Sequence, residues 1–201
     1  MAEERLRRGE QTRIKIIQAA HDLFVQQGYH GTSMRQIALG AEIALGGLYN
    51  HFASKEEVFQ AVFLEYHPYR EVLPRILDAQ GETIEEFVRD AVARILNAVE
   101  NRPDFMNLMF IEVVEFKSLH AQDLFASILP QVMPVVHRLL QTDQEKLSPI
   151  PELMLVRTFF GLIFGYFMTD IILGPQAPDG FRKDAEKYFV DIYLHGILTG
   201  E

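Results

Sequence analysis

The residues with the most distinctive chemistry lie between positions 32 and 55. Hydroxyl, imidazole and ammonium groups donate hydrogen bonds to phosphate oxygens, and they occur here beside expected helix ends at Thr32, Ser33, Tyr49, His51 and Lys55. The same stretch holds side chains that can contact base edges in a duplex groove, namely Arg35, Gln36, Leu45 and Asn50. The pattern favours contact with a nucleic acid.

These residues also have purely structural interpretations. Tyr49 and its neighbour Phe52 could fill the core of a small helical domain. His51 and Lys55 could be ordinary solvated residues at helix ends, where their charges interact with the helix dipole. Basic residues near the N-terminus could form a mobile arm that enters a minor groove or a solvated tail, and these are Arg5, Arg7 and Arg8.

A helix is expected immediately before this polar stretch. Its prediction over 12–27 rests on apolar residues at helical spacing, which are Ile14, Ile17, Ala20 and Phe24. Gly28 follows as the residue that stops the helix, because glycine tolerates the left-handed conformation found there. A second short helix is expected to turn Ile37, Ala38 and Ala41 inward.

Two capping boxes mark the helix starts within and after the polar stretch. Ser33 is followed three residues later by Gln36, and Ser54 is followed at the same spacing by Glu57. A turn over 41–44 leads to another short helix. Three helices within about 40 residues, the second and third joined by a four-residue turn, are typical of a helix-turn-helix.

The third of these helices begins in an unusual way. Gly46 and Gly47 leave its first turn without side chains, which lets the backbone approach a groove closely, although each costs about 1 kcal/mol of helix propensity. Ala44 cannot cap the helix with its side chain, which costs about 1 kcal/mol relative to serine.

A specific ordered set of residues extends over 12–62. It comprises Ala19, Ala20, Leu23, Phe24, Gly28, Tyr29, Thr32, Ser33, Ile37, Ala38, Gly46, Leu48, Tyr49, His51, Phe52, Ser54, Lys55 and Glu56. This set resembles the N-terminal domain of TetR-family transcriptional regulators. That family usually has glycine in the turn and serine before the third helix, so Glu42 and Ala44 are departures from its pattern. The resemblance therefore implies that Glu42 needs a positive φ, which non-glycine residues adopt rarely.

The resemblance implies that the chain has two domains with different functions. Residues 1–55 would form a DNA-binding domain, with the motif at about 33–52, and residues 56–201 a ligand-binding and dimerisation domain. A homodimer would place its third helices about 34 Å apart on a palindromic operator. The implied function is a regulator, most simply a repressor, that a small and largely apolar effector releases from double-stranded DNA.

The sparse base-reading residues leave a second hypothesis open. The chain could be a helical dimer that binds a ligand or partner and whose N-terminal domain no longer recognises a specific DNA sequence. In either case the fold class is all-α, with about nine helices predicted from the periodicity. Pro68 and Pro74 should end or kink the helix that starts after Ser54, and Pro130 and Pro134 make a continuous helix over 120–141 doubtful.

An effector pocket is expected among the apolar residues of the middle helices, although the same residues could simply form a core. Acidic residues in such a pocket would favour a cationic lipophilic ligand, unless they pair with a neighbour such as Arg157 or face water. The candidate lining residues are Phe105, Met109, Phe110, Glu112, Val113, Phe116, Phe160, Phe164, Phe167 and Asp170.

The last two helices carry the candidate dimer interface. The helix over 152–173 is apolar nearly all round and must be buried on several sides, either against its own chain or against a symmetry mate. Glycines would let a partner helix approach closely. The candidate interface residues are Gly161, Gly165, Phe189, Ile192 and Gly196.

Composition excludes several other classes of protein. The 201 residues include no cysteine, so disulfides, thiolate metal sites and cysteine nucleophiles are excluded. The seven histidines are scattered and no catalytic motif is present, so an enzyme, a cofactor and a metal site are not expected. A polar N-terminus and a longest uncharged apolar run of only 158–169 favour a cytoplasmic protein without a membrane partner.

The net charge of −9 is unevenly distributed. Residues 1–55 hold seven lysines and arginines against five acidic residues, a charge of +2, whereas residues 56–201 hold 12 basic and 23 acidic residues, a charge of −11. This distribution is compatible with nucleic-acid contact confined to the N-terminal part.

Overall fold

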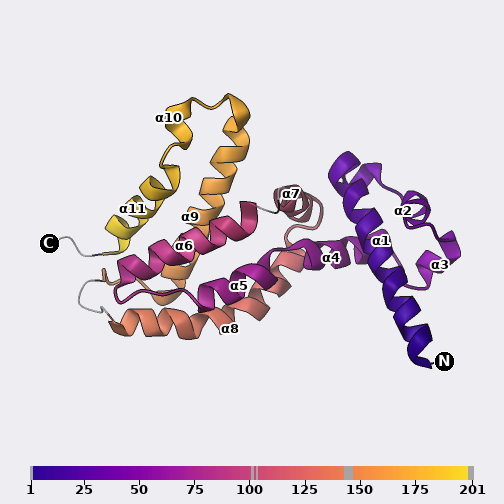
Figure 1. The fold of residues 1–201 in the computed structure, drawn as a ribbon, viewed down its shortest axis with the longest axis horizontal. Helices are drawn as coiled ribbons and strands as arrows, with labels where there is room; N and C mark the ends of the chain where they lie inside the picture. Colours follow the sequence, from indigo (N-terminus) through magenta and orange to yellow (C-terminus); the bar gives the residue numbers. More distant parts are fainter. Residues whose placement is uncertain (1, 101, 103, 143–146, 199–201) are drawn as a thin grey trace. The chain divides into compact units, whose positions relative to one another are not determined.

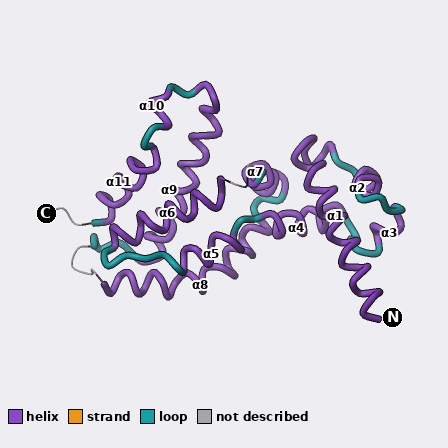
Figure 2. Tube along the Cα trace, in the orientation of Figure 1, coloured by secondary structure: helices purple, strands orange, loops and turns teal. Residues whose placement is uncertain are grey.

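The computed structural model describes residues 2–100, 102, 104–142 and 147–198. These residues form helices joined by loops, and their single β-bridge, between Leu147 and Leu198, is isolated (Figures 1 and 2). The expected all-α class is therefore confirmed. The chain divides into a first unit, residues 1–68 and 102–127, and a second unit, residues 69–101 and 128–201. The expected domain boundary after residue 55 stays a prediction.

The first unit holds the predicted helix-turn-helix. It contains α1 (Ala2–Gly31), α2 (Met34–Gly40), α3 (Leu45–Tyr49), α4 (Lys55–Tyr66), α7 (Phe105–Glu115) and the beginning of α8. In Figure 1, α2 and α3 lie beside α1. The core of the unit is built from side chains that α1 to α4 bury together, among them Ile17, Ala20, Phe24, Ile37, Ala38, Leu48, Phe52, Val58, Phe59, Val62 and Phe63.

The helix starts in this unit follow the local chemistry of the sequence. Ser33 caps α2 in a complete capping box, because its hydroxyl accepts from the Gln36 backbone while the Gln36 side chain accepts from the Ser33 backbone. Ser54 caps α4. As predicted, Ala44 gives α3 no side-chain cap. Glu42 has a φ of 57°, which confirms the left-handed turn residue.

Three expectations about α1 need correction. The helix begins at Ala2 instead of near residue 12, because residues 2–11 are rich in good helix formers, so Arg7 and Arg8 lie on a helix and not in an arm. Gly28 breaks the helix with a φ of 75°, but helical backbone resumes as far as Gly31. Ile14 is 49% exposed, and Ile16 is buried in its place.

The second unit is a helical bundle. It comprises α5 (Tyr69–Leu77), α6 (Ile84–Glu100), the last part of α8 (Leu119–Thr142), α9 (Glu152–Leu173), the 3-10 helix η2 (Gly174–Gln176), α10 (Asp179–Arg182) and α11 (Ala185–Ile197). Helix α5 packs on α6, and α9 packs on α11. One cluster of its core consists of Ile84, Val88, Val92, Leu96, Leu155, Val190, Leu194 and Ile197.

Prolines and turn residues shape the helices in ways that the sequence only partly indicated. Pro68 follows the end of α4 as expected, but Pro74 lies inside α5. Helix α8 is continuous through both Pro130 and Pro134, so the doubt about its continuity was wrong. The sequence predicts a single last helix over about 180–198, but the structure divides this stretch into α10 and α11, and Asp184 between them has a φ of 60°.

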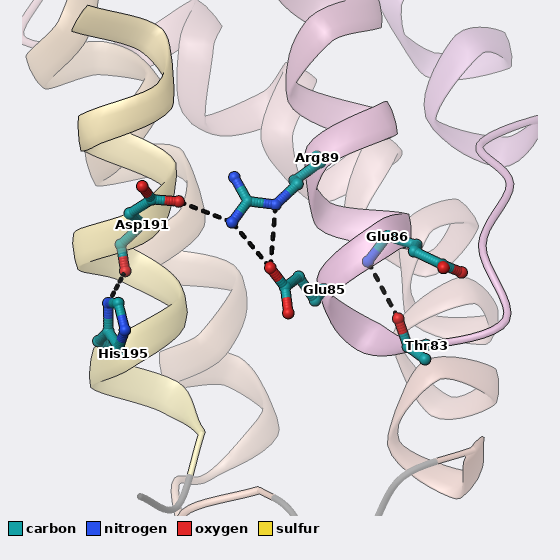
Figure 3. Close-up of polar contacts among 6 residues, drawn as sticks. All are labelled: Thr83, Glu85, Glu86, Arg89, Asp191 and His195. Atoms are coloured by element: carbon teal, nitrogen blue, oxygen red, sulfur yellow. Dashed lines mark hydrogen bonds and ion pairs between the residues drawn. The ribbon is translucent and has the colours of Figure 1, made fainter. Parts of the chain in front are cut away.

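A charged bridge joins α6 to α11 at the edge of the bundle (Figure 3). The Arg89 guanidinium donates to Glu85 at 2.8 Å and to Asp191 at 2.6 Å. These two carboxylates raise the pKa of Arg89. Beside them the Glu86 backbone N–H donates to the Thr83 hydroxyl at 3.2 Å, so Thr83 caps the start of α6.

Helix α9 is long and apolar enough to cross a membrane by length and composition alone, and it is the one such helix in the described part of the chain. Its 22 residues extend beyond the uncharged run at both ends and include Arg157 and Asp170. The core helix of a soluble protein passes the same test, and charged residues are costly inside a bilayer.

Candidate nucleic-acid interface

Helix α3 is held by apolar residues on one side and presents the others outward. Leu48 is fully buried and Phe52, just beyond the helix, is 4% exposed. On the outward side Leu45 is 40% exposed and Tyr49 is 51% exposed, and Gly46 and Asn50 are exposed as well. The helix therefore presents a phenol, an amide and side-chain-free backbone on one short surface.

Helix α2 contributes fewer polar groups to this surface than the sequence indicated. The Arg35 side chain is exposed. The Gln36 amide oxygen accepts from both the backbone and the hydroxyl of Ser33, at 2.9 and 2.7 Å. Capping thus engages two of the predicted contact residues, and Arg35 is the cation that α2 offers to a polyanion.

Two predicted phosphate donors have their side chains directed into the domain. Thr32 is 2% exposed, and its hydroxyl donates to the Gly28 carbonyl at 2.9 Å. The Lys55 ammonium donates to the carbonyls of Tyr29 and Thr32, at 2.7 and 2.8 Å. Burial lowers the pKa of Lys55, while the nearby Glu115 carboxylate acts in the opposite direction. His51, by contrast, is half-buried at the end of α3.

The structure adds one cation that the sequence analysis did not select. The Arg13 guanidinium lies 5.0 Å from the centre of the Phe52 ring, and its side chain is exposed. Arg13 comes from α1, which carries four basic residues at positions 7–15. The positive charge near α3 thus comes partly from α1. The charge count over residues 1–55 was the signal that could have identified it.

Comparison with known proteins finds relatives of this arrangement. Residues 16–62 match the model of bacterial regulatory proteins of the tetR family. Over 54 residues the chain is 43% identical to the HTH-type transcriptional regulator UidR of Escherichia coli K12, which covers 27% of this chain and 28% of UidR. The resemblance to this family is thus shown for residues 16–62, about a quarter of the chain. Its relatives are transcriptional regulators and not enzymes, which confirms the expectation that it is not an enzyme.

Similarity beyond the helix-turn-helix is weaker but covers almost the whole chain. The HTH-type transcriptional regulator YvkB of Bacillus subtilis is 20% identical over 195 residues, covering 92% of this chain and 97% of YvkB. NalD of Pseudomonas aeruginosa shares the fold, with a TM-score of 0.68 at 20% identity over 96% of this chain and 100% of NalD. The match to UidR spans less than a third of that relative's length.

The predicted pocket residues on and beside α7 have other neighbours. The Glu112 carboxylate is fully buried and accepts from the backbone of His120 and Ala121, at 2.7 and 3.0 Å, and from the His120 ring at 2.8 Å. Phe116 stacks on Phe59 with ring centres 4.6 Å apart. Glu112 thus joins α7 to the first turn of α8.

A cavity of about 70 Å³ lies inside the second unit. Helices α5, α6, α8, α9 and α11 line it, and Phe160 is the one predicted pocket residue among the lining side chains. Among the described lining residues Tyr193 alone has a polar side chain, and its hydroxyl donates to the Leu155 carbonyl at 3.1 Å. Burial raises the pKa of Tyr193, so its hydroxyl stays neutral at physiological pH.

The candidate dimer residues lie on α9 and α11. Ile192 is 73% exposed, and a Cβ added at Gly161 or Gly196 would meet no atom within 4 Å. Phe189 instead packs edge-on against Tyr166 within the chain, 5.7 Å between ring centres, and close to Gly165. Other large apolar side chains of the two helices are also exposed, namely Leu153, Met154, Phe164, Ile171, Ile172 and Tyr188.

Proposed function

We propose that this chain is a cytoplasmic, ligand-responsive transcriptional repressor that binds a palindromic operator as a homodimer. The observation that carries the proposal is the outward surface of α3, where Leu45, Gly46, Tyr49 and Asn50 are exposed on a helix anchored by Leu48. A short helix exposed in this way fits the major groove of B-form DNA. A protein that leaves its operator when an effector binds acts most simply as a repressor, which is also how NalD is described.

Contacts to the backbone and to the bases divide between different residues in this proposal. Tyr49 and His51 would donate to phosphates, together with Arg13 from α1 and the backbone N–H groups at the start of α2 and α3. Arg35, Asn50 and the Leu45 side chain would contact bases. Gly46 and Gly47 would allow α3 to approach the groove floor.

The dimer in this proposal forms through α9 and α11. Exposed apolar side chains on these two helices would be covered by the same helices of a second copy, giving a four-helix interface. Only 11% of the most apolar stretch of α9 is buried within the single chain. Exposed apolar surface of this extent is unfavourable in water and is typical of protein interfaces.

The effector in this proposal is neutral and apolar. The cavity of the second unit is lined by uncharged side chains, so a charged ligand would lose its hydration without gaining a partner. With a volume of about 70 Å³, the cavity is smaller than one of about 150 Å³ that holds benzene. An effector would therefore widen it by displacing α6 or α8, and α8 continues directly into the first unit.

Selection of bound fragments from random duplex DNA tests this function. We expect paired half-sites in mirrored orientation, about 34 Å apart from centre to centre. Asn50→Ala should relax the base preference at one position of each half-site by about 1–3 kcal/mol. Gln18→Ala, at an exposed position of α1, is the control and should leave the selected sequence unchanged. Equal affinity for every duplex would favour the alternative, a helical ligand-binding dimer without sequence-specific recognition.

A further inference from the structure

The two ends of the helix-turn-helix meet at a single side chain. The segment leaves the end of α1 at Thr32, runs through α2 and α3, and returns at Lys55, the first residue of α4. The Lys55 ammonium donates to the Thr32 carbonyl at 2.8 Å and to the Tyr29 carbonyl at 2.7 Å. One side chain thus joins the residue before Ser33 to the residue after Ser54, which are the N-caps of α2 and α4.

The surroundings of the ammonium are those of an internal contact. Its nitrogen lies 4.1 Å from the centre of the Tyr29 ring, at a distance where a cation is attracted to the aromatic face. The Tyr29 carbonyl lies in the last turn of α1 and also accepts from the Thr32 backbone N–H at 3.2 Å, and Thr32 follows the helix. Lys55 therefore adds a charged donor to two carbonyls at the point where α1 ends.

The end of α7 also contacts Tyr29 and its neighbour His30. The Phe116 ring, at the end of α7, meets the Tyr29 ring edge-on with centres 4.9 Å apart. The Glu115 carboxylate accepts from the ring of His30, the residue after Tyr29, at 2.6 Å. The contact formed by Lys55, Tyr29 and Thr32, here called the clasp, is thus bounded by the helix-turn-helix on one side and by the end of α7 on the other.

We propose that Lys55 is a positioning residue for operator recognition, which fixes the base of the helix-turn-helix through the clasp instead of neutralising a DNA phosphate. The inference rests on the proposed function, because it concerns how α3 is presented to an operator. The two possible roles of Lys55 have different consequences for DNA affinity. A lysine bound to a phosphate contributes to affinity for every duplex, whereas a clasp contributes to the fit of α3 and so to the preference for the operator.

The test compares Lys55→Met with Lys15→Met, a control at an exposed lysine of α1. Operator affinity and affinity for an unrelated duplex are measured over a range of salt concentrations. For Lys55→Met we expect operator affinity to fall about tenfold or more, affinity for the unrelated duplex to stay within about twofold, and the slope of log K against log salt to stay unchanged. A slope reduced by about 0.9 would identify Lys55 as a phosphate ligand and overturn the proposal.

Amide hydrogen exchange of the protein without DNA provides a readout that does not depend on the proposed function. Lys55→Met should speed the exchange of amides over 33–50 and leave those of α9 unchanged, and absence of this change would overturn the clasp. If Lys55→Met fails to fold, Tyr29→Leu replaces it, with Tyr29→Phe as the control that keeps the ring beneath the ammonium. If the wild-type chain selects no operator but exchange still responds, the proposed function fails and the clasp stands.

Discussion

At the scale of single residues, His67 should make stability depend on pH. Its ring lies between aromatic neighbours, 5.3 Å from the Phe63 ring centre and 4.8 Å from that of Phe105. Burial lowers the pKa of His67 from 6.5 to about 4. Between these values the unfolded chain binds a proton that the folded chain does not. The stabilising contribution is therefore fully present above pH 6.5 and is lost as the pH falls, by up to about 3 kcal/mol.

Urea unfolding of the wild type and of His67→Leu between pH 7 and pH 4.5 measures this contribution. The unfolding free energy of the wild type should fall more steeply toward low pH than that of the variant, which has no group to protonate at this position. Parallel curves for the two proteins would show that His67 stays accessible to protons in the folded state.

Residue roles could be predicted from the sequence where they depend on neighbours a few positions away. The positive φ of Glu42 was expected because the family that the sequence resembles usually has glycine at this turn position, and the missing cap at Ala44 followed from its residue type. The roles of Lys55 and Glu112 did not, because Lys55 meets carbonyls 23 and 26 positions earlier and Glu112 meets His120 across a turn. Spacing identifies a polar residue, but its partner is decided by tertiary packing.

At the scale of secondary-structure elements, α8 should gain stability when a proline is removed. Pro130 lies inside a continuous helix and is exposed, so its ring contributes little to the core while it removes one backbone hydrogen bond. Pro130→Ala should raise the unfolding free energy by about 1–3 kcal/mol, measured by urea unfolding at fixed protein concentration. Gln122→Ala, exposed in the same helix, should change it by less than about 0.5 kcal/mol. If Pro130→Ala is less stable than the wild type, the packing of α8 requires the bend that a proline introduces into a helix.

The same comparison explains which elements could be predicted. Helices that begin at a side-chain cap, such as α2 and α4, were located to within a residue because the cap is a local signal. The first turns of α1 were missed because they carry helix propensity without an apolar period. The cavity could not be found from the sequence, since five helices contribute to it and the apolar residues that line it look like any core.

At the scale of the whole molecule, the proposed function depends on a second copy of the chain. Ile192 tests this point well, because its side chain is 73% exposed and its replacement disturbs little within one chain. Placing a charge there, as Ile192→Glu, would bury an unpaired carboxylate in a dimer interface formed by α9 and α11, which is costly. Sedimentation should then show a monomer, while Glu186→Gln, at an exposed acidic position of α11, should remain dimeric.

Operator binding should change together with the assembly. A dimer gains affinity because binding of the first half-site holds the second helix-turn-helix close to its own, and this gain amounts to about 10²–10⁴ for linked sites. Ile192→Glu should lose most of that factor on the full operator and bind an isolated half-site as the wild type does. If Ile192→Glu stays dimeric, the dimer does not form through this surface of α9 and α11. If the wild-type chain is monomeric both free and on DNA, the proposed dimer is wrong.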